Sequence, residues 1–419
     1  MGAEMPRVLV LSEGEGHAEA LLPFAAALAG QRGVGVTVAE LVKDDECVRC
    51  RGEQVWERTL DGRPAVQARG FRVRLRGESD IVQFLADKPH DLWLVDRAMP
   101  WDGALRLADA AAQMKAALAA ARGPLEGKVR RLGVGCGGGV HCLEAASLGR
   151  DLAVSWGATA EAVRVTLPPQ PEGESLSPQQ AAAEVGRLLT LARISIPVRA
   201  VAANSVMDGL KECSRNYDLM LLGATSVARM EHFFPGSVGY DAPARLECPT
   251  VIVQAPEWRP LPLAAFVCEE TVRLGAAPRT MREALALLAK ALGAAGGWAA
   301  SRQKDVEEAA VRFDETRPGG VAEGITVGWA GVLGAGPMRG ALGVWPDGVG
   351  GGAKAVFLLS GGFWDSASHL RAAHSISRLA GTPDARAALM AASSPKAAME
   401  ALAMAAPPQT EELGFPRID

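Results

Sequence analysis

The 419-residue sequence contains no uninterrupted apolar run of about 18 residues, the length that a membrane-spanning helix requires. Its nearest approach, residues 284–300, is interrupted by Lys290 and a pair of glycines and is typical of an amphipathic helix. The N-terminus lacks the charged and apolar regions of a secretory signal peptide. Seven cysteines, an odd number in a long chain, do not favour a disulfide framework. These absences predict a cytoplasmic protein without direct membrane insertion.

A strong charge of one sign is also lacking, because 44 basic and 48 acidic residues leave a formal net charge of −4. This balance gives no electrostatic reason to expect nucleic acid as a partner. The sequence has no nucleophile elbow, no P-loop lysine and no Rossmann fingerprint, since Gly135–Gly139 lacks the downstream acidic residue. We find no complete catalytic constellation, and therefore expect a protein that is not an enzyme.

An internal repeat sets the domain organisation. Two short apolar strands, each followed by a helix that begins at a histidine, recur 141 − 17 = 124 positions apart: Arg7–Leu11 with His17, and Leu132–Cys136 with His141. Two further strands, each preceded by an aspartate, lie 218 − 91 = 127 positions apart: Leu92–Val95 and Leu219–Leu222. Two copies of one α/β unit, residues 1–125 and 126–256, are therefore expected. We expect His17 and His141 to have equivalent structural roles.

The second copy alternates apolar strands with helices, which predicts a mostly parallel sheet covered on both faces. Ser177 and Gln180 are spaced as a capping box at the start of one of its helices. A proline-rich segment, residues 256–262, then separates a third domain of a different α/β kind, residues 263–405, from the rest. A second capping box, Thr280 with Glu283, opens that domain's long helix. Residues 406–419 form a tail.

The second copy resembles the universal stress protein family, whose ATP-binding members carry a spaced glycine loop after the fourth strand. The matching residues here are Gly223, Ser226, Gly236 and Ser237. The resemblance implies an adenine-nucleotide-alpha-hydrolase-like fold, a stress-response role, and ATP or AMP bound at these four residues. Ser226 replaces the family's second glycine, and Gly137 stands where ATP-binding members carry an aspartate. Nucleotide binding and a structural loop without ligand both remain open.

The first copy is more degenerate, because Glu13 occupies the position of that aspartate and no glycine pattern follows Val95. The resemblance implies that its role is to pair with the second copy, as a pseudo-dimer or within a homo-oligomer.

The third domain resembles the enzyme IIA domain of the fructose/mannitol class of the phosphotransferase system. The resemblance rests on Gly324–Ala330, on the strand Ala355–Leu359 and on His369 near the start of a helix. The family's phospho-histidine position is Trp329 here, and His369 matches its supporting histidine. An indole nitrogen only donates hydrogen bonds and cannot accept a phosphoryl group. We therefore expect an inactive domain that senses a ligand or docks a protein.

Cys47 and Cys50 form a lone C-x-x-C pair, interpreted as a loop or as a metal or redox site shared across a dimer. His232 is expected to cover the sheet edge or to stack on a base, and no metal site is predicted.

The favoured function is a non-catalytic cytosolic regulatory or sensor protein that controls a membrane transporter. An ATP-binding enzyme or phosphotransfer component, and a structural assembly protein with degenerate ligand sites, are the alternatives. The sequence identifies neither the ligand nor the partner.

Overall fold

The structure is a computed structural model. It describes residues 7–13, 21–32, 34–42, 52–58, 66–76, 90–95, 111, 116–122, 129–137, 139–168, 177–224, 238–255, 261–295, 302–316, 320–332, 338–350, 352–362 and 366–405. The chain divides into two compact units. Unit 1 is Met1–Gly186 with Ser195–Trp258, and unit 2 is Arg187–Ile194 with Arg259–Asp419. The domain boundaries expected from the sequence stay predictions.

Unit 1 alternates strands and helices along most of its length. Its elements are β1 (Arg7–Glu13), α1 (Leu22–Arg32), β2 (Gly35–Val42), β3 (Gly52–Arg58), β4 (Val66–Arg76), β5 (Leu92–Val95), β6 (Ala117–Arg122), β7 (Arg131–Gly135), α4 (Val140–Trp156), β8 (Thr159–Thr166), α5 (Pro178–Leu191), β9 (Val198–Ala202), α6 (Val206–Ser214), β10 (Leu219–Gly223), α7 (Val238–Arg245) and β11 (Thr250–Gln254). The last residues of α5, from Arg187 on, belong to unit 2.

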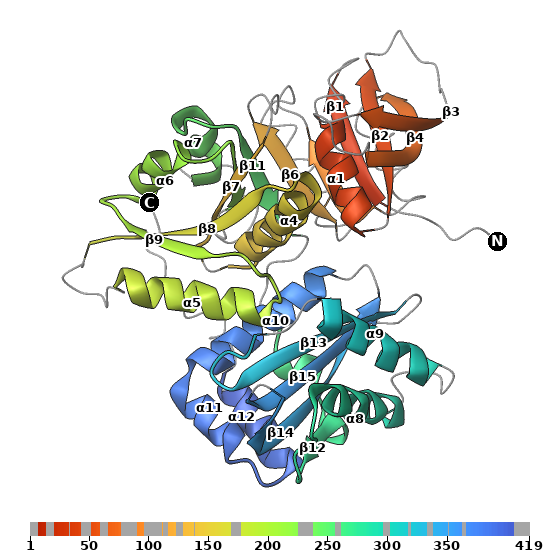
Figure 1. The fold of residues 1–419 in the computed structure, drawn as a ribbon, viewed down its shortest axis with the longest axis vertical. Helices are drawn as coiled ribbons and strands as arrows, with labels where there is room; N and C mark the ends of the chain where they lie inside the picture. Colours follow the sequence, from red (N-terminus) through yellow and green to blue (C-terminus); the bar gives the residue numbers. More distant parts are fainter. Residues whose placement is uncertain are drawn as a thin grey trace, which may run out of the picture. The chain divides into compact units, whose positions relative to one another are not determined.

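All strands of unit 1 form one 11-stranded sheet in the order β3-β4-β2-β1-β5-β6-β11-β10-β7-β8-β9 (Figure 1). Neighbours run parallel except in two pairs, β3 with β4 and β6 with β11. From the β6–β11 junction outward, the first half has the order β6-β5-β1-β2-β4-β3 and the second half has the order β11-β10-β7-β8-β9. Both halves begin with their last strand, last but one, first and second, but the first half has six strands and the second has five. The α/β fold class with a mostly parallel sheet is therefore confirmed.

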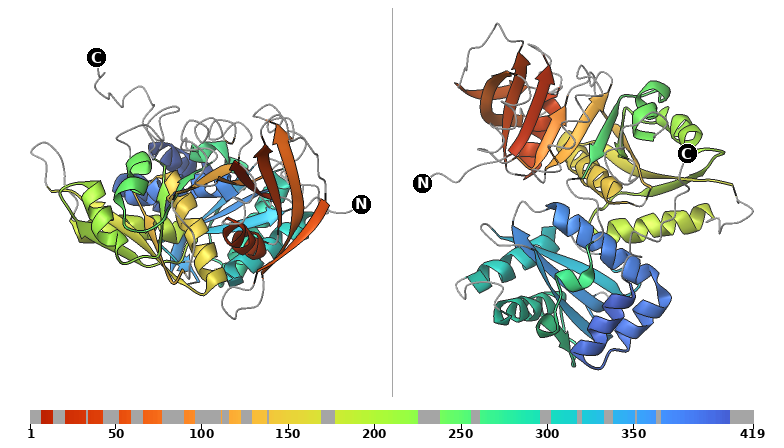
Figure 2. Two further views of the ribbon diagram at one scale, coloured as in Figure 1. Left: turned by 90° about the horizontal axis from the view of Figure 1, so that it is seen from above. Right: turned by 180° about the vertical axis from the view of Figure 1, so that it is seen from behind.

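The two halves of unit 1 share a hydrophobic core. Trp93 from β5 and Leu118 from β6 are fully buried in one cluster with Leu222 from β10 and Ile252 from β11. On the other face of the sheet, α1 and α4 lie side by side (Figures 1 and 2), and the rings of Phe24 and Trp156 meet edge to face, 6.0 Å between centroids. Because strands such as β5 are buried on both faces, they are apolar throughout, as parallel strands require.

Unit 2 is built around a four-stranded mixed sheet of order β12-β14-β15-β13. Its strands and helices are β12 (Val272–Leu274), α8 (Met281–Ala294), α9 (Gln303–Thr316), β13 (Ile325–Val332), β14 (Arg339–Val349), β15 (Ala353–Gly362), α10 (Ser366–Gly381), α11 (Pro383–Met390) and α12 (Pro395–Met404). Two short 3₁₀ helices, Leu263–Ala265 and Glu269–Thr271, precede β12.

Side chains alternate between the two faces of this sheet. In β15, Phe357 and Leu359 contact the core formed with α10, α11 and α12, whereas Val356 and Leu358 contact the core formed with α8 and α9. Figure 2 shows the helices on the two sides of the sheet. Among the described residues, no helix has both the length and the apolar character needed to cross a membrane.

Local sequence signals position several helix starts. Ser177 and Gln180 form the expected capping box, in which each backbone N–H donates to the other side chain, at 2.9 and 3.2 Å. The box expected at Thr280 forms only in part. Thr280 accepts from the N–H of Glu283 at 3.2 Å, but the Glu283 carboxylate accepts from the N–H of Arg279 instead of that of Thr280.

The junction strand β6 offers a test of the shared core. Leu118 is fully buried and pairs with Trp93 on one side and Gln254 on the other. Leu118→Ala should lower the free energy of unfolding of unit 1 by about 2–5 kcal/mol, because it removes buried contacts and leaves a cavity. Leu167→Ala, at a position 42% exposed in the same unit, should cost less than about 1 kcal/mol. Urea denaturation of both variants measures the difference, and equal effects would contradict a core shared at β6.

Candidate functional site

A cavity of about 230 Å³ opens at the carboxyl ends of β7, β8 and β10 in unit 1. Its lining comprises Gly135, Cys136, Gly137, Gly139, His141, Cys142, Val163, Arg164, Val165, Val206, Leu210, Leu222, Gly223, Ala224 and Val238. The chain leaves β7 toward β8 on one side and returns through α6 to β10 on the other. Such a switch in direction leaves a crevice outside the strand ends, which is where open α/β sheets bind ligands.

Gly223, the last residue of β10, allows α4 to approach this edge of the sheet. A Cβ at Gly223 would lie 2.7 Å from the backbone nitrogen of Cys142 and 2.8 Å from the carbonyl carbon of His141. Gly223 is not among the described glycines that have positive φ. Its backbone conformation is therefore open to other residues, and only the close contact with the first turn of α4 requires glycine.

The N-terminus of α4 faces the cavity without a capping side chain. Its N-cap residue Gly139 has an extended conformation (φ −95°, ψ 175°), and the first turn contains no acidic residue. The partial positive charge of a helix N-terminus attracts anions. The backbone N–H of Gly137 donates to Sγ of Cys142 at 3.1 Å, which holds the preceding loop against the helix.

Among the described residues of the cavity lining, only Arg164, on β8, carries a formal charge. Its Nη1 donates to the carbonyl oxygens of Gly137, at 2.5 Å, and of Cys136, at 3.5 Å. Its Nε is buried and has no hydrogen-bond partner within the described part of the chain. A buried donor left without an acceptor costs about 1–3 kcal/mol. A ligand that supplies an acceptor to Arg164 would therefore recover this free energy.

His141 has a structural role at the mouth of α4. Its Nδ1 accepts a hydrogen bond of 3.0 Å from the backbone N–H of Ala255, just after β11. This bond means that Nδ1 carries no proton, and it ties α4 to the neighbouring strand. The hydrogen bond from Ala255 gives His141 the structural role that the sequence predicts.

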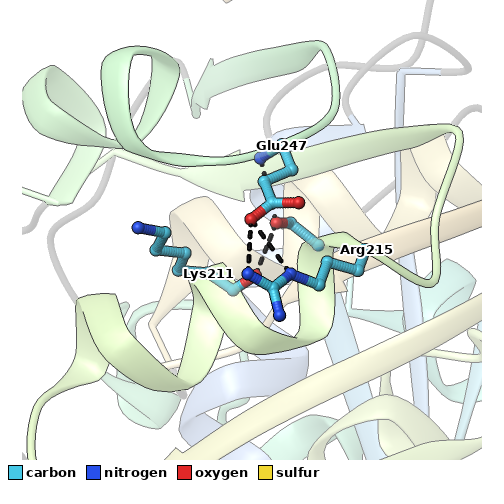
Figure 3. Close-up of polar contacts among 4 residues, drawn as sticks. Lys211, Arg215 and Glu247 are labelled. Carbon is cyan, nitrogen blue, oxygen red and sulfur yellow. Dashed lines mark hydrogen bonds and ion pairs between the residues drawn. The ribbon is translucent and has the colours of Figure 1, made fainter.

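Figure 3 shows an ion pair between Arg215, at the C-terminal end of α6, and Glu247. The same helix supplies Val206 and Leu210 to the cavity. The guanidinium of Arg215 donates twice to Glu247, at 2.9 and 2.8 Å. Ser214 Oγ accepts from the N–H of Glu247 at 3.0 Å. The hydrogen bonds from Arg215 hold the pKa of the Glu247 carboxyl below its usual value. The end of α6 is thereby attached to the turn between α7 and β11.

The predicted site residues are only partly within the described structure. Gly223 contributes to the lining of the cavity, as does Gly137. Ser226, Gly236 and Ser237 lie outside the described residues, as do His17, Cys47, Cys50 and His232. Among the described residues, no group of three or more His, Cys, Asp or Glu side chains is arranged to hold a metal ion.

Sequence reasoning missed Arg164, Cys136 and Cys142. One signal was available for Arg164, a charged residue between Val163 and Val165 near the end of an expected strand. The two cysteines carried no comparable signal, because nothing local indicates that both face one cavity.

A second cluster, in unit 2, brings together Trp329 and His369, which the sequence assigned to the degenerate phosphotransfer position. Trp329 projects from β13 and His369 from α10, and their ring centroids are 5.0 Å apart at an interplanar angle of 43°. The ring of Phe313 meets His369 edge to face, with centroids 6.0 Å apart. Both Trp329 and His369 are buried.

Arg193 contacts this cluster through the ring of Phe313. It has a left-handed conformation with φ of 57°, pairs with Asp314 at 3.0 Å, and donates from Nε to the carbonyl oxygen of Val327. Its guanidinium also lies over the ring of Phe313, 5.9 Å from the centroid. Burial lowers the pKa of Arg193, and the charge of Asp314 acts in the opposite direction. The carbonyl oxygen of Val327 and the carboxylate of Asp314 thus compensate this buried cation.

The sequence matches no family model. A search of curated proteins finds no relative. Among solved structures, nitrogen regulatory protein IIA-Ntr from Neisseria meningitidis is similar over 33% of this chain and 98% of its own, with 17% identity and a TM-score of 0.29.

Two further solved structures are similar to part of the chain. A universal stress protein in complex with cAMP matches 31% of this chain and 99% of its own, with 20% identity and a TM-score of 0.25. The cytoplasmic domain of a prokaryotic cation chloride cotransporter matches 60% and 97%, with 11% identity and a TM-score of 0.39. These likenesses assign neither a family nor an activity to the chain.

Gly223→Ala tests the contact that shapes the cavity. The added methyl group would meet backbone atoms of α4, which cannot move aside cheaply, so we expect a loss of about 1–3 kcal/mol in the free energy of unfolding. Gly186→Ala, in α5, is the matched control, because a Cβ there meets nothing within 4 Å. The control should be stabilised by about 0.5–1 kcal/mol, since alanine suits a helix better than glycine. Thermal and chemical unfolding of both variants measure these changes. An unchanged free energy of unfolding for Gly223→Ala would contradict the close approach of α4 to Gly223.

Proposed function

We propose that this chain is a non-catalytic regulatory protein that binds an adenine nucleotide, ATP or AMP, in the cavity beside Arg164. The observation that carries the proposal is the pairing of one cation with an uncapped helix N-terminus in a largely apolar cavity at the switch point of the sheet. Valine and leucine side chains there suit an apolar face such as a nucleobase, while Arg164 and α4 suit a phosphate. The glycine loop that begins at Gly223 adds support from the sequence.

A regulatory role is favoured over catalysis by the side chains available. The described lining contains no carboxylate, and Nδ1 of its one histidine is occupied by the N–H of Ala255. In unit 2, Trp329 stands where a phospho-histidine would be needed, and an indole cannot accept a phosphoryl group. The described lining of the cavity therefore offers no carboxylate base, and the unit 2 cluster has no phosphoryl acceptor at position 329.

We extend the proposal to tandem stress-protein units that pair as a pseudo-dimer within one chain. The antiparallel β6–β11 pairing and the matching order of the four strands nearest to it on each side support this extension. Cytoplasmic control of a membrane transporter, with a role in stress response and assembly into a homo-oligomer, belongs to the same proposal. That part rests on the family resemblances of the sequence.

Calorimetric titration with AMP and ATP tests the nucleotide site. The unaltered protein should bind at least one of them, and Arg164→Gln should weaken binding about 10- to 100-fold, the effect of losing a hydrogen bond to a charged group. Val206→Trp should block binding, because an indole at this partly exposed position fills the cavity. Val154→Trp, on an exposed part of α4 outside the lining, is the control and should bind normally. No heat from either nucleotide up to millimolar concentration would reject the nucleotide site.

Incubation with a phosphorylated phosphocarrier protein tests the inactive state proposed for unit 2. Mass spectrometry should detect no added phosphoryl group, because Trp329 cannot accept one. Trp329→His, with a second imidazole beside His369, is the informative variant, since it reintroduces a nitrogen lone pair at this position. A phosphohistidine in the unaltered protein would overturn the non-catalytic assignment.

A further inference from the structure

Two free cysteines line the unit 1 cavity from adjacent segments. Cys136 follows β7 directly, and Cys142 lies in the first turn of α4. Sγ of Cys142 is 3.1 Å from the backbone nitrogen of Gly137. That nitrogen is two bonds from Cα of Cys136. The Cys142 sulfur therefore lies within about 6 Å of the Cys136 Cα atom. Cys136 and Cys142 are therefore neighbours at one edge of the cavity.

The two thiols differ in their surroundings. Cys136 is only 5% exposed, whereas Cys142 is partly exposed. Burial raises the pKa of the Cys136 thiol well above its usual value, the neighbouring Cys142 adds to this rise, and Arg164 opposes it. Cys136 therefore stays protonated, and Cys142 is the sulfur that a small reagent reaches first.

The segment between the cysteines is rich in glycine. Its sequence begins Gly137-Gly138-Gly139, and glycine accepts backbone conformations closed to other residues. The other described cysteines, Cys213, Cys248 and Cys268, do not line the cavity. Proximity, unequal access and a permissive loop thus coincide at this pair within the described residues.

We propose that Cys136 and Cys142 are a reversible oxidation site that a hydroperoxide converts to a disulfide. The Cys142 sulfur attacks a peroxide oxygen, the O–O bond breaks, and an alcohol or water leaves while Cys142 becomes a sulfenic acid. The Cys136 sulfur then attacks the Cys142 sulfur. The S–S bond forms as the S–O bond breaks, and the hydroxyl leaves as water with the Cys136 proton. Two electrons pass from the two thiols to the peroxide, and a dithiol reductant reverses the change.

The disulfide would tie the end of β7 to the first turn of α4 at the edge of the cavity. It would also remove both thiols from the lining, so the shape of the cavity would depend on the redox state. This inference does not require that a nucleotide binds, since the chemistry involves only the two sulfurs and the oxidant.

Peptide mapping of the native protein tests the pair. Residues 132–150 form one tryptic peptide that contains both cysteines, because Lys and Arg are absent between Leu132 and Gly149. After brief treatment with hydrogen peroxide and alkylation in denaturant, this peptide should be lighter by two hydrogen atoms and carry no alkyl group. Prior reduction with dithiothreitol should restore two alkyl groups. This measurement needs no variant, so it does not depend on how a substitution folds.

Single variants identify the order of events. Cys136→Ser should leave Cys142 to form a sulfenic and then a sulfinic acid, while Cys142→Ser should leave Cys136 reduced. Cys268→Ser, at an exposed cysteine outside the cavity, should still give the light peptide. The proposal fails if peptide 132–150 of the native protein keeps both thiols while Cys268 is oxidised, or if Cys142 is joined to another cysteine.

Discussion

Parallel strand pairing constrains this protein more than any other interaction. Because β7, β8 and β10 run in the same direction, the segments that follow them all emerge at one edge of the sheet. The first turn of α4 is placed above that edge, and Gly223 allows it to approach within contact of β10. The cavity, its single cation and its two thiols all follow from this arrangement. A side chain at Gly223 would act on each of them at once.

The cavity of unit 1 contains one positive charge, that of Arg164, and no carboxylate among the described residues of its lining. Arg164 is held by two backbone carbonyl groups but has no carboxylate partner among the described residues, so its charge is available to an anionic ligand. The thiols lie beside it, one buried and one accessible. The cavity thus combines one cation and two thiols with an otherwise largely apolar lining among the described residues.

The buried cation of unit 2, Arg193, differs from Arg164 because it has a carboxylate partner. Arg193 lies in the cluster around Trp329 and His369, where Asp314, the carbonyl oxygen of Val327 and the ring of Phe313 all compensate its charge. The left-handed backbone at Arg193 costs about 1–3 kcal/mol for such a residue, which these contacts offset. The ring of His369 is thereby packed between aromatic groups, with no second imidazole in the described part of the cluster.

The sequence alone determined the local and periodic features. Buried strands such as β11 and the Ser177 capping box were predicted, because apolar runs and spaced polar residues act through near neighbours in the chain. Tertiary structure decided which distant residues meet. The antiparallel β6–β11 junction, the β3–β4 pair, Arg164 beside Gly137, and the common cavity of Cys136 and Cys142 all depend on contacts between separate segments. No local pattern encodes such contacts, because they depend on the order in which distant strands pair within the sheet.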